Sequence, residues 1–133
     1  MQRILGIDYG TRYFGFALGD VLTGIAVPLE VVEVSNTDPI KLIWGMVDAD
    51  GYDTIVLGTP RNADGEETEA SKKVEAFAKQ LEEVVGVKVH LVSEHLTSKI
   101  SDQLAHESGE EHNDALAAML IVQEYLNELR TSS

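Results

Sequence analysis

The sequence predicts an α/β fold with a mixed five-stranded sheet, in which three antiparallel strands come first, parallel strands follow, and helices cover both faces. Two observations support this prediction: strand-like apolar runs crowd into the first 34 residues, and strand-like and helix-like segments alternate after residue 38. Such alternation is typical of right-handed crossovers, which place helices on both sides of a sheet. With 133 residues, the chain has the size of one domain, and we expect a single domain over residues 1–133.

The first three strands are predicted at the N-terminus. Residues 3–8 form a short apolar run that ends in Asp8, and turn residues separate it from a second run at 13–18. This pattern predicts a hairpin with Asp8 at its mouth. Residues 24–34 are rich in valine and predict a third strand, in which Pro28 indicates a sheet edge or a bulge.

A helix and a buried strand are predicted next. Asp38 is a favourable helix cap and Pro39 a favourable first helical residue, and apolar residues recur at helical spacing until Gly51. The apolar run at residues 54–57 then predicts a buried strand.

A loop, an amphipathic helix and a fifth strand follow. Residues 58–65 are dense in turn formers, and apolar residues at helical spacing over 74–85 predict a helix that Gly86 can end. Residues 87–92 alternate between apolar and polar side chains and predict a strand that ends just before Glu94.

Two further helices are predicted in the last third of the chain. Thr97 can cap a short helix that carries Ile100 and Leu104. Eight consecutive apolar residues at 115–122 indicate a buried helix from about Asp114 to Leu129, with a frayed tail after it.

Composition restricts the classes of function. The sequence has no cysteine, which excludes disulfides and thiolate metal sites, so a metal would be held by oxygen or imidazole. No signal peptide or membrane span is predicted, and we expect a cytoplasmic protein. Lys and Arg number 10 against 23 Asp and Glu, for a formal net charge of -13, which argues against a broad electrostatic surface for nucleic acid but not against a local one.

Three carboxylates are the candidate catalytic residues. The carboxyl ends of parallel strands meet at one sheet edge, which is where α/β sheets bind ligands. Asp8 and Glu94 lie at two such ends, and Asp114 opens a helix that can reach the same edge. Crowded carboxylates repel one another unless a cation neutralises them, and Mg²⁺ or Mn²⁺ is the cation that suits oxygen ligands. Together, the three carboxylates predict a metal site for phosphodiester cleavage.

Each acid also has a structural explanation. Asp8 is a favourable turn residue, Glu94 could be a solvated strand-end acid, and Asp114 suits the dipole of a helix start. Only the combination of the three predicts catalysis. Glycines beside Asp8, at positions 6, 10 and 15, can allow close backbone approach or positive φ, and Arg12 in the hairpin turn can contact a phosphate.

The sequence resembles the YqgF family, also called RuvX, over nearly its whole length. Four segments carry the resemblance: GIDYGTR at residues 6–12, GTP at 58–60, SEHLT at 93–97 and DALAA at 114–118. The resemblance implies an RNase H-like fold and a metal-dependent endonuclease acting on structured nucleic acid. The family is regarded as processing the 5′ end of pre-16S ribosomal RNA, and Holliday junction resolution in DNA is its older assignment.

The resemblance carries catalytic and metal-binding roles onto the same three acids. Candidate substrate-binding residues lie in the matching motifs and in the loop after the fourth strand: Gly10, Thr11, Arg12, Arg61 and Thr97. Two segments depart from the family pattern. Ser93 and His95 stand where the family has Asp and Arg, and residues 106–112 are acidic where the family is basic. These departures suggest a narrow substrate, a ribosomal or other protein partner that supplies positive charge, or weak activity.

Two other classes of protein stay open at this point. GIDYGTR also resembles the first phosphate loop of sugar kinases and actin-like ATPases, although the sequence has no second Gly-rich phosphate loop. A catalytically silent binding module of the same fold is the other alternative. The sequence is compatible with a monomer or a homodimer, and a dimer would favour junction cleavage because symmetric cuts need paired sites.

Overall fold

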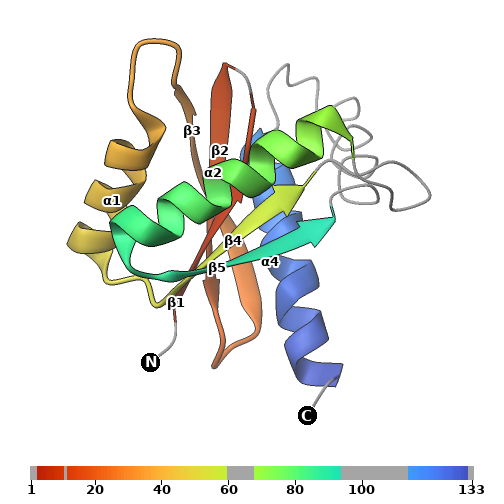
Figure 1. The fold of residues 1–133 in the computed structure, drawn as a ribbon. Coiled ribbons are helices and arrows are strands. Elements are labelled where there is room, and N and C mark those ends of the chain that lie inside the picture. The colour runs from red at the N-terminus through yellow and green to blue at the C-terminus, as the bar shows by residue number, and fades with distance from the viewer. Residues whose placement is uncertain (1–2, 11, 60–67, 94–113, 132–133) are drawn as a thin grey trace, which may run out of the picture.

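A five-stranded mixed sheet forms the centre of the molecule (Figure 1). The computed structural model describes residues 3–10, 12–59, 68–93 and 114–131. The strands are β1 (Arg3–Asp8), β2 (Tyr13–Asp20), β3 (Ile25–Glu33), β4 (Thr54–Thr59) and β5 (Lys88–Ser93). Their order in the sheet is β3-β2-β1-β4-β5. The first three strands are antiparallel neighbours and β4 and β5 join in parallel, which confirms the predicted sheet.

The described helices cover the two faces of this sheet (Figure 1). Helices α1 (Pro39–Asp50) and α2 (Glu69–Val85) lie on one face, and α4 (Asp114–Thr131) lies on the other. Helix α4 ends at Thr131, two residues beyond the predicted end at about Leu129, so part of the tail that was expected to fray is helical. The predicted short helix after Thr97 lies outside the described residues. None of the described helices is long and apolar enough to cross a membrane.

Local sequence explains where the first two helices begin and end. The Asp38 side chain accepts a hydrogen bond from the Ile40 backbone at 3.1 Å, so it caps α1 as predicted. Thr68 and Ser71 form a capping box at the start of α2, a signal that the sequence analysis missed. Gly51 and Gly86 end the two helices with φ of 70° and 76°, a conformation that favours glycine.

The two edge strands differ in how their edges are protected. In β3, Pro28 lacks a backbone donor and the pairing with β2 shifts register between Gly15 and Ala17, so both predicted features, an edge and a bulge, are present. In β5, the Val89 backbone N–H donates to the Glu82 side chain of α2 at 3.1 Å. Both devices discourage a further strand from pairing at the edge.

Two apolar clusters hold the layers together. The cluster between the sheet and α1 and α2 is built from large side chains, among them Phe14, Phe16 and Phe77. The cluster beneath α4 is built partly from small residues, including Ala17 and Ala118. The helices on each side are therefore fixed to the sheet by different kinds of contact.

Candidate active site at the carboxyl edge of the sheet

Three parallel strands end at the same edge of the sheet. Ile7 of β1 pairs with Leu57 of β4, and Thr59 at the end of β4 pairs with Ser93 at the end of β5. Asp8 is the last residue of β1 and is partly buried. The predicted placement of Asp8 at this edge is confirmed. Glu94 follows β5 directly in the sequence, but its position lies outside the described residues.

Close packing fixes the direction of α4 across the sheet. A Cβ at Gly6 would collide with a Val122 methyl group and lie 3.0 Å from the Ala118 carbonyl oxygen. A Cβ at Gly19, nearer the other end of the sheet, would collide with Val122 and lie 3.6 Å from Leu126. Helix α4 therefore runs antiparallel to β1, and its N-terminus lies toward the end of the strand that carries Asp8.

This arrangement brings the start of α4 toward Asp8. Asp114 precedes Ala118 by one helical turn, about 6 Å along the helix, and Asp8 lies two residues beyond Gly6, about 7 Å along the strand. Strand residues alternate between faces, and Ile4 packs in the cluster beneath α4, so Asp8 is on the α4 face as well. The backbone thus places Asp8 and the first residue of α4 at one end of one face.

Gly6 and Gly10 permit close approach, and the glycines at positions 6, 10 and 15 do not adopt positive φ. Positive φ among the described glycines occurs at Gly24, Gly51 and Gly86, so the alternative of positive φ at residues 6, 10 and 15 was wrong. Gly6 is instead required because α4 lies directly above it. Gly10 is required because a Cβ there would collide with the Tyr13 carbonyl oxygen, which closes the turn after Asp8.

The other predicted site residues are placed less completely. Asp114 is the first residue of α4, and the structure describes its backbone only. Thr11, Arg61 and Thr97 also lie outside the described residues, as Glu94 does. Within the described part of the chain, no group of three His, Asp or Glu side chains could hold a metal ion. The three-carboxylate metal site therefore stays a prediction.

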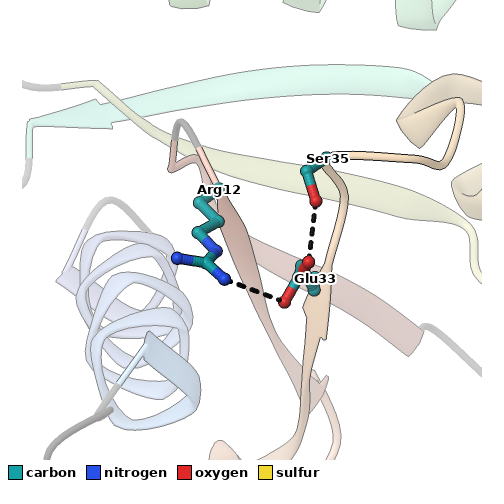
Figure 2. Close-up of polar contacts among 3 residues, drawn as sticks. All are labelled: Arg12, Glu33 and Ser35. Atoms are coloured by element: carbon teal, nitrogen blue, oxygen red, sulfur yellow. Dashed lines mark hydrogen bonds and ion pairs between the residues drawn. The ribbon is translucent and has the colours of Figure 1, made fainter.

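Arg12 belongs to a polar cluster that the sequence analysis did not identify. Its guanidinium lies 3.7 Å from a Glu33 carboxylate oxygen and 5.4 Å from the centre of the Tyr13 ring. The Ser35 hydroxyl donates to the other Glu33 oxygen at 2.7 Å. Figure 2 shows Glu33 between Arg12 and Ser35. The register of the second hairpin, in which Tyr13 pairs with Glu33, is the signal that could have revealed the cluster.

The cluster lowers the pKa of Glu33. The hydrogen bond from Ser35 is the main influence that lowers the pKa of Glu33 below its usual 4.5, and the positive charge of Arg12 and a Tyr13 hydrogen bond act in the same direction. Desolvation opposes the shift and is a smaller influence than either Ser35 or Arg12. A glutamate is ionised at neutral pH even without this shift, so Arg12 faces a negative charge there.

The donor chemistry at the edge fits a hard divalent cation. The acid that the structure describes there is a carboxylate, the helix that approaches it begins with a second Asp, and the sequence contains no thiolate. Mg²⁺ and Mn²⁺ prefer oxygen ligands of this kind.

Comparison with known proteins identifies similar chains over almost the whole length. Residues 2–128 match the family described as RuvX, Holliday junction resolvase. A protein of Lactobacillus helveticus, with the provisional name pre-16S rRNA nuclease, is 32% identical and the match covers 95% of this chain and 96% of that protein. A protein of Azotobacter vinelandii with the same provisional name is 35% identical, with 96% and 94% covered.

Solved structures of Holliday junction resolvases share the fold. RuvC of Thermus thermophilus, solved with a Holliday junction substrate, matches with a TM-score of 0.57 and 16% identity, covering 98% of this chain and 96% of that one. The Fowlpox virus resolvase in complex with Holliday junction DNA matches with a TM-score of 0.59 and 12% identity, covering 96% and 99%. At such low identities these matches support the fold, and the predicted RNase H-like architecture is confirmed.

Proposed function

The chain belongs to the RuvX family of Holliday junction resolvases, and from that premise we propose that it is a divalent-metal-dependent endonuclease that hydrolyses phosphodiesters of structured nucleic acid. The observation that carries the proposal is the convergence of Asp8 and the start of α4 on one face of the sheet. The kinase-like alternative has less support, because the family match extends over residues 2–128.

We assign the metal to Asp8, Glu94 and Asp114. A bound Mg²⁺ or Mn²⁺ would supply an activated water and would stabilise the developing negative charge on the phosphate. The three carboxylates would hold the cation at the carboxyl edge of the sheet. Gly10, two residues after Asp8, has no room for a side chain, because a Cβ there would collide with the Tyr13 carbonyl oxygen.

The substrate-binding residues flank the acids. Arg12 is exposed at the hairpin turn and offers a bidentate contact to a phosphate oxygen pair. We assign Thr11, Arg61 and Thr97 to the same task from their places in the sequence. The chain has a formal net charge of -13, so these local contacts, rather than a broad basic surface, would select the substrate.

We propose 5′-end processing of pre-16S ribosomal RNA in the cytoplasm as the specific reaction. The provisional names of the curated relatives support RNA, and cleavage of a DNA junction is the second candidate because of the family description. The large negative charge favours a protein or ribosomal partner that supplies positive charge. A monomer could trim RNA, whereas symmetric junction cleavage would need a homodimer.

Cleavage of labelled structured RNA and of a four-way DNA junction, at low salt with Mn²⁺, tests this function. Asp8→Asn removes a metal-binding charge and should lower the cleavage rate at least about 100-fold. EDTA should abolish cleavage by the native chain. Asp48→Asn is the matched control, because it removes one exposed carboxylate from α1, on the opposite face, and should cleave like the native chain.

Two results would contradict the proposal. A folded native chain that cuts neither substrate would indicate a binding module. Cleavage that survives Asp8→Asn would show that the active site lies elsewhere. If only one substrate is cut, its identity decides between the RNA and DNA assignments.

A further inference from the structure

The polar cluster around Arg12 lies on the same face of the sheet as Asp8. Phe14 and Val32 are paired residues of β2 and β3, and both pack on the opposite face, in the cluster of large side chains. Their neighbours Tyr13 and Glu33, also paired, therefore project from the α4 face. Arg12 lies three residues before Gly15, the partner of Asp8, or about 10 Å along the strand.

Glu33 lies beside the Arg12 guanidinium, the group that a phosphate would also contact. A carboxylate and a phosphate present similar pairs of oxygens to a guanidinium. The Arg12–Glu33 separation of 3.7 Å is longer than a hydrogen bond, and both side chains are exposed, so this pair is weak and easily exchanged. The Ser35 hydroxyl donates to the other Glu33 oxygen at 2.7 Å, and this hydrogen bond does not involve Arg12.

We propose that Glu33 acts as a built-in competitor for Arg12, which a nucleic-acid phosphate must displace, and that it thereby weakens nucleic-acid binding at this site. The proposal rests on the proposed function, because it requires a phosphodiester substrate near Arg12. Once displaced, the Glu33 carboxylate remains beside the bound phosphate and repels it. Glu33 thus lowers the affinity of any substrate that contacts Arg12, so binding depends more on the other contacts that the substrate makes.

Binding of a fluorescently labelled RNA hairpin, measured by anisotropy at low salt in EDTA so that no cleavage occurs, tests the proposal. Glu33→Gln should tighten binding by about two- to fivefold. Glu30→Gln is the matched control: it removes one charge from the same strand, but Glu30 acts on Tyr52, which packs on the opposite face. The gain from Glu33→Gln should disappear when Arg12 is changed to Gln, since the competition is then absent.

Each outcome of this experiment is informative. A gain specific to Glu33→Gln and dependent on Arg12 supports the competitor role. Equal affinities for Glu33→Gln and Glu30→Gln, weaker binding by Glu33→Gln, or no binding by any variant would overturn it. Weaker binding would mean that Glu33 orients Arg12 for the substrate. Cleavage with Mn²⁺ by the native chain and Asp8→Asn is scored separately, so failure of the nuclease assignment and failure of this proposal are distinguishable.

Discussion

The two faces of the sheet are built in different ways. The face beneath α1 and α2 is filled by large side chains, with the rings of Phe14 and Phe77 5.6 Å apart in an edge-to-face contact. The face beneath α4 has glycines at positions 6 and 19, where the helix lies directly on the strands. Large side chains keep a helix at a distance and supply apolar burial, whereas glycines let it approach closely.

The two faces therefore have different roles: the first mainly stabilises the fold, and the second sets the position of the candidate site. Any large side chain of suitable volume can stabilise the first face, since cores tolerate apolar exchange. On the α4 face, the small residues set how close α4 lies to β1, and thus how close Asp114 comes to Asp8. We therefore expect truncations on the first face to reduce stability, and enlargements on the second to disturb catalysis as well.

The largest effect should come from truncating the first face. Phe16 is fully buried, and Phe16→Ala should lower the free energy of unfolding by about 3–5 kcal/mol, because it removes apolar contacts and leaves a cavity. Urea denaturation followed by circular dichroism measures this loss. Leu22→Ala is the control, since Leu22 is 77% exposed, and should change stability by no more than about 0.5 kcal/mol. Similar values for the two variants would contradict the assigned core.

A smaller loss of stability, with a larger effect on cleavage, is expected from enlarging the second face. Gly6→Ala places a methyl group against Val122 and the Ala118 backbone, and should cost about 1–3 kcal/mol while shifting α4 away from β1. Cleavage per folded molecule should fall, and Val122→Ala in the same chain should partly restore both properties.

A glycine on the other side provides the matched control. Gly45, in the middle of α1, would meet nothing within 4 Å if it carried a Cβ. Gly45→Ala should therefore stabilise the chain by about 0.5–1 kcal/mol and leave cleavage unchanged. Equal responses at the two glycines would show that close packing of α4 does not determine the site.

Much of the fold could be predicted because its signals are local. Asp38, Pro39 and Gly51 mark the ends of α1 within one short segment, and Pro28 indicated the edge strand. Thr68 was missed because its capping partner is Ser71, rather than the more usual Glu or Gln. The end of α4 was misplaced because no glycine or proline follows it, so the sequence contains no local stop signal.

The site could be predicted only in part, because its geometry depends on distant residues. The place of Asp8 followed from its position at the end of an apolar strand. The need for Gly6 became clear only once α4 was placed, since Gly6 and Val122 are far apart in the sequence. Likewise, the sequence predicted Arg12 as a phosphate contact, but its partner Glu33 comes from another strand and depends on a register that a bulge alters.

The smallest predicted effect is a change in stability with pH that depends on His90. This residue lies at the edge of the sheet face that α4 covers. His90 on β5 packs against Tyr125 of α4 in a tilted ring contact, with ring centres 5.0 Å apart. Burial lowers the pKa of His90 from its usual 6.5 and the charge of Lys88 adds to this, while Glu82 opposes it. The folded state therefore favours neutral His90. Its contribution to stability is present above pH 6.5 and is lost as the pH falls through the lowered pKa.

Thermal unfolding between pH 7.5 and 5 tests this assignment, with those limits chosen to span about one unit or more on either side of the usual pKa. The native chain should lose more stability on acidification than His90→Gln, which has no titrating group at this position. Lys88→Gln should show a smaller loss than the native chain, because it removes one of the two influences that lower the pKa. If His90→Gln and the native chain respond identically, the contact between β5 and α4 does not depend on the charge of His90. The α4 face would then accept a positive charge at its edge, although it has no room for a methyl group at Gly6.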